Sequence, residues 1–360
     1  MKRILASNFD GVFKWIATAS ILVIAWALLT GGLTRCSELP RDSLIVYCAH
    51  DSIYSEQILR EFERQTGIPV AIRFDTEATK SLGLVELIAR ERERPRCDVL
   101  WNNEQLGTMW LAEQGLLEAY KGDGYARIPE PFKDPAGRWT GFAARMRVWI
   151  VNTQAMEPTH EAIESALASP DLSRVAIAKP LFGTTRTHYT VLWHLWGPDR
   201  LKAWHRDWRS RGVVEASGNA MVKDLVAGRT CHLGLTDTDD YFVAKDAGKP
   251  VAMLPVTVHS DTETENSEIA IVIPNTVAII KGTRKATQAM KLVDFLLSAE
   301  TELALASAKS RQIPLGPVDL VLLSDEIRQL TQWSRQSYPL SELGPPSEQC
   351  LAWLRSEYLR

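Results

Sequence analysis

The sequence has few cysteines and no excess of positive charge. Its five cysteines are spread over 360 residues without a CxxC pair or a His/Cys cluster at metal-ligand spacing. The formal net charge is -3 at pH 7, so no basic surplus is present to neutralise phosphates, and we expect no nucleic-acid partner. Cys48 and Cys97 lie in apolar, strand-like runs, which predicts buried free thiols.

The common catalytic motifs are also missing. No GxSxG elbow, HExxH helix, phosphate-binding P-loop or CxxC pair occurs in the chain. Asp239 and Asp240 together with Glu104 leave a metal-dependent hydrolase open as an alternative, but an acidic surface loop is the simpler interpretation of the two aspartates. We therefore expect a binding protein rather than an enzyme.

One long apolar run is present, close to the N-terminus. Three basic residues precede the uncharged residues 15–34. This run reaches the ~20 residues of a membrane helix and exceeds the ~7–15 residues of an ordinary signal-peptide core. Cys36 stands where a bacterial lipoprotein signal has its lipidated cysteine, but Arg35 replaces the usual small residue. We expect residues 1–40 to direct export to the periplasmic or extracytoplasmic face, as a cleaved signal, a lipid anchor or a retained membrane helix.

Strands and helices alternate after this run. Residues 44–48 and 97–101 are short apolar runs typical of buried strands. Between them, Ile58 and Phe62 belong to a helix pattern that ends at Gly67. This alternation predicts an α/β fold with parallel strands.

Polar residues follow both of these strands. His50 and Asp51 come directly after the first, and Asn103 and Glu104 follow the next. Because ligands bind outside the carboxyl ends of the strands in open α/β sheets, these four side chains are expected to face a binding cleft. For His50 and Asp51 taken alone, an ordinary polar loop is an equally good interpretation.

The length allows two domains, since single cores stop growing near ~250–300 residues. A strand at residues 148–151 leads into a second set of elements, and the pattern returns to its earlier character after Ile273. Two strand crossings between lobes predict a hinged cleft. The expected division is residues 44–143 with 272–345 for lobe 1, residues 144–271 for lobe 2, and residues 346–360 as a C-terminal tail.

The twelve tryptophans do not identify a ligand. Four of them lie at helical spacings, which predicts core packing rather than a stacking cage: Trp193, Trp196, Trp204 and Trp208. Trp101, beside a polar strand end, is a candidate for the cleft.

The order of these strand and helix segments along the chain resembles that of the extracellular solute-binding proteins of ABC importers, specifically the ferric-iron-binding branch. The resemblance covers roughly residues 44–320, the size of two lobes. The stretches that carry it are Val46-Tyr47 to Phe62, Thr66-Gly67-Ile68, Cys97-Asp98-Val99 to Gln105, Arg145-Met146-Arg147-Val148, Gly218-Asn219 to Gly228, Ile273 to Ile279, Phe295-Leu296-Leu297-Ser298 and Gln312-Ile313-Pro314-Leu315. It implies a type II periplasmic-binding-protein-like fold, with two α/β lobes joined by a double-strand hinge.

The resemblance also implies a set of metal ligands. The family's iron site uses a histidine after the first strand, a glutamate after the third and two adjacent tyrosines in the second lobe. Glu104 matches the glutamate, whereas the histidine position falls on Asp51, with His50 one step earlier. The tyrosine pair falls on Thr238 and Asp239.

The phenolate ligands that favour ferric iron are therefore replaced. The carboxylates of Asp51, Glu104 and Asp239 would still suit a hard cation through oxygen ligands. Tyr241 is the fallback ligand if this alignment is shifted. The same carboxylates would equally suit an organic ammonium group.

A small anion completes the site in the family. Gly183-Thr184-Thr185 at a helix start matches its anion pocket, since free N–H groups and the positive dipole end bind anions there. Asn219 and Thr236 stand at the family's asparagine positions, and Arg145 is a cationic supplement. Thr184 or Thr185 as a simple N-cap is the alternative.

The resemblance thus implies the solute-binding component of an ABC import system, acting as a monomer with a membrane permease as its partner. Its solute would be ferric iron or an iron–anion complex, and no cofactor would be required. An anionic organic solute such as a phosphonate or a carboxylate is the alternative that the lost tyrosines raise.

Overall fold

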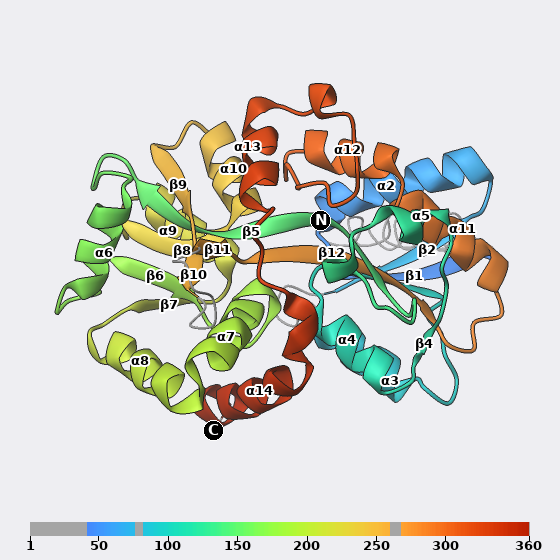
Figure 1. The fold of residues 1–360 in the computed structure, drawn as a ribbon, viewed down its shortest axis with the longest axis horizontal. Coiled ribbons are helices and arrows are strands. Elements are labelled where there is room, and N and C mark those ends of the chain that lie inside the picture. The colour runs from blue at the N-terminus through green and yellow to red at the C-terminus, as the bar shows by residue number, and fades with distance from the viewer. Residues whose placement is uncertain (1–41, 76–81, 260–267, 360) are drawn as a thin grey trace, which may run out of the picture. The chain divides into compact units, whose positions relative to one another are not determined.

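The computed structural model describes residues 42–75, 82–259 and 268–359 (Figure 1). The described helices and strands all belong to one compact unit, Leu44–Arg360. The apolar residues 15–34 and Cys36 lie outside the described part. Within that part, no helix combines the length and the apolar character that crossing a membrane requires.

The first strands and helices alternate as the sequence predicts. Strand β1 (Leu44–Cys48) pairs in parallel with β2 (Val70–Phe74) and with β3 (Val99–Asn102). The elements around them are α2 (Ser52–Thr66), α3 (Leu82–Arg90), α4 (Leu106–Glu113), β4 (Leu117–Glu118), α5 (Asp123–Arg127) and the 3-10 turn η2 (Glu130–Phe132).

Helix α2 shows why this alternation forms. Ile58, Leu59 and Phe62 lie on one buried face, and full burial of a side chain such as Phe62 contributes about 1.5–3 kcal/mol. Gly67 ends the helix with φ 69°, a left-handed conformation that glycine adopts without strain.

Two long strands cross the sheet side by side. Strand β5 (Thr140–Asn152) pairs antiparallel with β12 (Val272–Ile280) through its first half, and its second half pairs with β8 (Leu233–Asp237) and β9 (Val251–Pro255). With β6 (Val175–Ala178) and β7 (Val214–Ala216), the strand order is β2-β1-β3-β12-β5-β8-β6-β7. Figure 1 shows β5 and β12 running together between two groups of elements, one around β1, β2 and β3 and the other around β6, β7 and β8.

The remaining elements between β5 and β12 complete the second group. They are α6 (His160–Ala168), β6 (Val175–Ala178), α7 (Gly183–Trp196), α8 (Pro198–Ser210), β7 (Val214–Ala216), α9 (Asn219–Ala227), α10 (Thr238–Asp246) and the hairpin strands β10 (Thr257–His259) and β11 (Glu268–Ala270). Strand β6 pairs in parallel with both β7 and β8.

After β12 the chain packs against the first strands again. Helix α11 (Ala286–Leu296) contributes Leu292 and Leu296 to the apolar cluster that contains Val46 and Phe62. The later elements are α12 (Ala299–Ser307), η3 (Leu320–Leu322), α13 (Asp325–Trp333), η4 (Leu340–Leu343) and α14 (Gly344–Tyr358).

The C-terminal residues 346–360, expected as a tail, lie largely in helix α14. Cys350 and Leu354 on this helix are fully buried. They belong to one apolar cluster with Leu84 of α3 and Leu201 of α8. Helix α14 therefore packs against both groups of elements, and Figure 1 shows it beside α7.

The cysteines and tryptophans are placed largely as predicted. Cys48 and Cys97 are buried free thiols, which confirms the expectation. Trp193 and Trp208 are buried, whereas Trp196 and Trp204 are half-buried. Trp101 is fully buried in the apolar cluster that contains Val46 and Phe62, and its indole N–H donates to Asn275 Oδ1 at 3.4 Å, so it packs in the core rather than in a cleft.

Candidate functional site

A pocket of about 320 Å³ lies where the strand ends of the two groups of elements meet. Asp51 and Asn103 reach it from the ends of β1 and β3. The opposite wall comes from the segments after β6, β7 and β8. The polar and charged side chains of that wall include Lys179, Thr184, Thr185, Asn219, Asp237, Asp239 and Asp240.

Two arginines of the crossing strand β5 form the base of this region. Side chains two residues apart share one face of a strand, so Arg145 and Arg147 point the same way while Met146 between them enters the core. Arg145 lines the pocket, its Nη2 donates to the Asn103 carbonyl oxygen at 2.7 Å, and its Nε lies 4.0 Å from Asp239 Oδ2. Arg145 therefore links the two groups of elements.

Arg147 is fully buried and pairs with Asp237. Its Nη1 donates to Asp237 Oδ1 at 2.7 Å, and the two side chains are 0% and 5% exposed. The second carboxylate oxygen, Oδ2, accepts a hydrogen bond from Thr184 Oγ1 at 2.5 Å and one from Asn219 Nδ2 at 2.9 Å. Thr185 Oγ1 donates to Asn219 Oδ1 at 3.0 Å. This network holds three of the predicted anion-pocket side chains in fixed positions.

Two helices begin at this pocket without a side-chain cap. Helix α7 starts at Gly183, and α9 starts at Asn219; neither of their N-cap residues, Phe182 and Gly218, makes a side-chain cap hydrogen bond. The first N–H groups of a helix have no partner within the helix, and the positive end of its dipole attracts anions. With Lys179 at the rim, this wall is suited to an anion.

Carboxylates gather on the neighbouring wall. Asp237, Asp239 and Asp240 bring oxygen atoms within 4.8 Å of one another, and they are the one such group of three metal-ligating side chains in the described part of the chain. Thr236 Oγ1 donates to Asp240 Oδ2 at 2.7 Å and orients it. Asp237 is paired with Arg147, and Arg145 lies 4.0 Å from Asp239, so these carboxylates are held beside two arginines of β5.

The negative charge of these carboxylates also affects the pKa of Tyr54, which lies on α2 in the other group of elements. Burial raises the pKa of its phenol to about 12, and the charges of Asp239, Asp51 and Asp240 add to the rise. Carboxylates from both groups of elements therefore act on one phenol. Tyr54 was not predicted as part of the site, because it lies inside a helix pattern rather than after a strand.

Glu104 was expected to face the binding cleft, but its side chain points to the start of α4 instead. Its carboxylate accepts the backbone N–H groups of Leu106 at 2.7 Å and Gly107 at 2.8 Å, and thereby caps the start of α4. Arg186 Nη2 lies 3.4 Å from its Oε1. Glu104 is 1% exposed and is not among the described residues that line the pocket.

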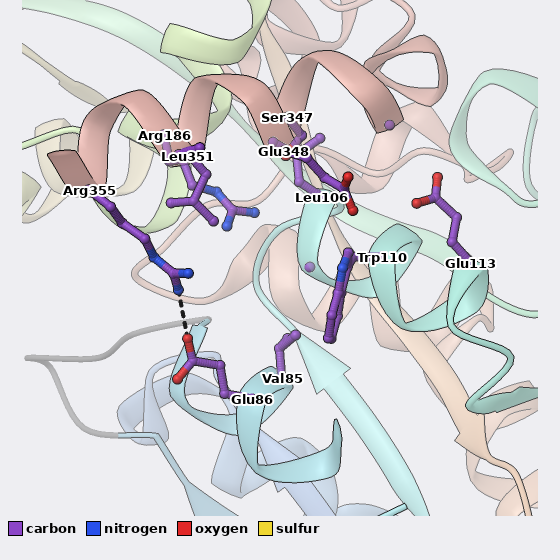
Figure 2. Close-up of a pocket in the computed structure, with 13 residues that line it drawn as sticks. Val85, Glu86, Leu106, Trp110, Glu113, Arg186, Ser347, Glu348, Leu351 and Arg355 are labelled. Atoms are coloured by element: carbon purple, nitrogen blue, oxygen red, sulfur yellow. Dashed lines mark hydrogen bonds and ion pairs between the residues drawn. The ribbon is translucent and has the colours of Figure 1, made fainter. Parts of the chain in front are cut away.

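A second cavity, of about 310 Å³, lies on the Arg186 side. It is bounded by α3, α4 and the C-terminal helix α14, with Trp110 and Leu351 among its apolar residues. Figure 2 shows the ion pair of 2.8 Å between Arg355 and Glu86 that joins α14 to α3 at its edge. This cavity therefore lies at the seam between the two groups of elements.

Four other predicted residues also lie outside the described lining of the pocket. His50 is 2% exposed, its Nε2 lies 3.1 Å from Gln312 Nε2, and its ring packs 5.5 Å from Trp101. Thr236 and Thr238 are fully buried. Tyr241, the fallback ligand, packs in an apolar cluster with its ring 5.2 Å from Phe242.

The pocket thus brings together seven of the predicted residues: Asp51, Asn103, Arg145, Thr184, Thr185, Asn219 and Asp239. Arg147 and Asp237 were missed, although they form the buried pair beneath it. The alternation of Arg145 and Arg147 around an apolar residue within a strand was the signal that could have identified Arg147.

Comparisons with known proteins agree with this architecture. Residues 44–308 match the family model described as bacterial extracellular solute-binding protein. Iron uptake protein A1 of Synechocystis sp. is 22% identical over 357 residues, which cover 93% of this chain and 94% of the relative.

Two solved structures have a similar fold. Iron-bound HitA from Pseudomonas aeruginosa superposes with a TM-score of 0.73 at 20% identity, covering 87% of this chain and 98% of HitA. The periplasmic binding protein AfuA from Actinobacillus pleuropneumoniae, with fructose-6-phosphate bound, superposes with a TM-score of 0.71 at 19% identity, covering 88% and 99%. These likenesses confirm the two-lobed α/β fold of periplasmic binding proteins that the sequence predicted.

Proposed function

Because the chain belongs to the family of bacterial extracellular solute-binding proteins, we propose that it is the solute-binding component of an ABC import system. It captures its solute in the pocket between the two lobes. The single observation that carries this proposal is that pocket, which Asp51 and Asn103 of one lobe and Asp239 and Asn219 of the other line together. A solute that contacts both walls stabilises the closed arrangement of the lobes.

The proposed cargo is ferric iron held together with a small anion. Asp51, Asp239 and Asp240 offer hard oxygen ligands from both lobes. Two similar proteins, iron uptake protein A1 and the iron-bound HitA, favour iron among the hard cations. No tyrosine is among the described residues that line the pocket. The iron complex is therefore expected to lack the strong visible band that charge transfer from a phenolate to iron produces.

The anion occupies the other wall. The uncapped starts of α7 and α9 supply backbone N–H groups, and Lys179 and Arg145 supply positive charge. The pocket volume of about 320 Å³ lies at the lower end of small-molecule sites, which span ~300–1,000 Å³. An organic anion with several oxygen atoms, such as citrate, can therefore share the space with the metal.

An anionic organic solute without metal is the second candidate. The observation that favours it is the same positive wall, in which Lys179 and two helix starts face the pocket. AfuA, which was solved with fructose-6-phosphate, has the same fold. In this alternative Asp51 and Asp239 would bind hydroxyl or ammonium groups of the solute.

Calorimetric titration separates the two candidates. Ferric citrate should bind to the wild-type protein, and citrate or a phosphonate without iron should bind at least about tenfold more weakly. Asp239→Asn combined with Asp240→Asn should remove most of the affinity for ferric citrate. Asp246→Asn is the matched control, because Asp246 lies on the same helix and pairs with Arg311 at 2.9 Å, away from the pocket. Stronger binding of the metal-free anion, unchanged in the double variant, would support the organic solute instead.

The remaining assignments follow from this function. We propose residues 44–143 with 272–345 as lobe 1 and residues 144–271 as lobe 2. Family membership makes the protein an exported one. Its proposed place is the periplasmic face of the membrane, where residues 15–34 serve as export signal or anchor. It would act as a monomer that delivers its cargo to a membrane permease.

A further inference from the structure

A third cavity lies in the second lobe, apart from the site just described. Its volume is about 360 Å³, and no described residue lines both this cavity and the pocket between the lobes. It is bounded by α6, α7, α8 and the strands β5 and β10. Four indole rings line it, those of Trp149, Trp196, Trp204 and Trp208.

The indoles form one continuous wall. The ring centroids of Trp204 and Trp208 are 4.3 Å apart, those of Trp149 and Trp208 are 6.4 Å apart, and those of Trp196 and Trp204 are 5.7 Å apart. Trp149, Trp196 and Trp204 are only half-buried, so parts of their surfaces are accessible. Three of the tryptophans that the sequence pattern assigned to core packing therefore line an open cavity.

One buried polar side chain also lines this aromatic cavity. His188 on α7 is 5% exposed, and its Nδ1 has no hydrogen-bond partner among the described residues. Burial and the nearby charge of Arg147 hold the pKa of His188 well below its usual value, so the imidazole is neutral. Buried polar groups in proteins are normally paired, so Nδ1 of His188 stands out as an unpaired polar atom among the described residues that line this aromatic cavity.

The charges at the rim cancel. Glu164 and Arg200 are both exposed and of opposite sign, and the Arg200 guanidinium lies 4.9 Å from the centroid of the Trp196 ring. The cavity therefore has no strong preference for a charged ligand. Its size and its aromatic lining with one buried polar group are typical of small-molecule sites.

We propose that this cavity binds a neutral, planar aromatic or heteroaromatic molecule, which stacks on Trp204 and forms a hydrogen bond with His188. Stacked or edge-on contact with several indoles supplies the attraction. The hydrogen bond selects ligands that carry a ring donor or acceptor. This site is independent of the proposed cargo, because the two pockets share no described lining residue.

Benzimidazole is the probe, because its ring carries both an N–H donor and a nitrogen acceptor. Indene is the matched ligand, since it has the same ring shape and no polar atom. Calorimetry and ligand-detected NMR should show benzimidazole binding with a Kd of about 1 mM or tighter. Indene should bind about tenfold more weakly.

Two variants place the binding in this cavity. Thr257 on β10 is half-buried and lines the cavity, so the larger side chain of Thr257→Trp should fill it. This variant should abolish benzimidazole binding and leave ferric citrate binding unchanged. His188→Phe keeps an aromatic ring and should remove the difference between benzimidazole and indene. If His188→Phe fails to fold, the ligand pair and Thr257→Trp still decide the question. Absence of benzimidazole binding up to about 10 mM, equal binding of indene by the wild type, or undiminished binding by Thr257→Trp would each overturn the proposal.

Discussion

Replacing Arg147 by methionine should destabilise the protein far more than replacing an arginine at the surface. Arg147 is 0% exposed and donates to Asp237 at 2.7 Å. Methionine fills similar space but leaves the buried Asp237 carboxylate without its cation. Breaking a buried ion pair from one side costs about 3–5 kcal/mol. Because Asp237 keeps its hydrogen bonds from Thr184 and Asn219, the lower half of that range is expected.

Arg355→Met is the control. Its partner Glu86 lies at 2.8 Å, close to the Arg147–Asp237 distance, but the two side chains are 46% and 49% exposed. Exposed pairs contribute about 0–1 kcal/mol. The two variants therefore differ in burial much more than in pair geometry.

Urea unfolding at pH 7 measures both variants as free energies of unfolding. A double variant, Arg147→Met with Asp237→Leu, removes both charges and should lose less stability than the sum of the two single variants. The reasoning would be refuted if Arg147→Met cost no more than Arg355→Met, or if the double variant were as unstable as the sum.

Three further predictions concern single side chains. In an ultraviolet titration, Tyr54→Phe should show one phenol fewer that ionises near pH 12. The raised pKa means that folding favours the neutral phenol, so the wild type should lose part of its free energy of unfolding between about pH 10 and 12, and Tyr54→Phe should not lose that part. The ring of His205 forms hydrogen bonds with the hydroxyls of Tyr189 and Tyr358, and burial lowers its pKa. Because the unfolded chain then binds a proton more readily than the folded protein, the free energy of unfolding should fall as the pH drops below about 6.5, and it should fall less steeply in His205→Gln. Glu104→Ala should cost about 3–5 kcal/mol in urea unfolding, because the buried Arg186 loses its carboxylate partner and α4 loses its cap, whereas Glu104→Gln should bind ferric citrate within about threefold of the wild type; a larger loss would make Glu104 a cargo ligand.

The alternation of strands and helices could be predicted from sequence because it depends on local periodicity. The face of α2 with Ile58 and Phe62, and its end at Gly67, follow from side-chain spacing and glycine conformation alone. The two-lobed fold came from the order of the segments, which the comparisons confirm. The polar strand ends at Asp51 and Asn103 were found for the same topological reason.

What could not be predicted depends on contacts between distant residues. Arg147 and Asp237 form an ion pair although they lie 90 positions apart in the sequence. Strand β5 begins at Thr140, well before the predicted strand at residues 148–151, because the two arginines interrupt its apolar pattern. The direction of the Glu104 side chain is decided by the nearby N–H groups of α4, which position alone does not reveal. Residues 346–360 were expected as a tail, whereas they lie largely in α14, whose two prolines stand in the first turn, where proline is well tolerated.

The central claim is that the pocket between the lobes holds a hard cation together with an anion. Native mass spectrometry with elemental analysis of the exported protein, purified without chelators, tests it most directly. The predicted result is one iron and one small anion for each chain in the wild type. The adduct should be lost when Asp239→Asn and Asp240→Asn are combined. A metal-free organic adduct that survives in that double variant would contradict the claim.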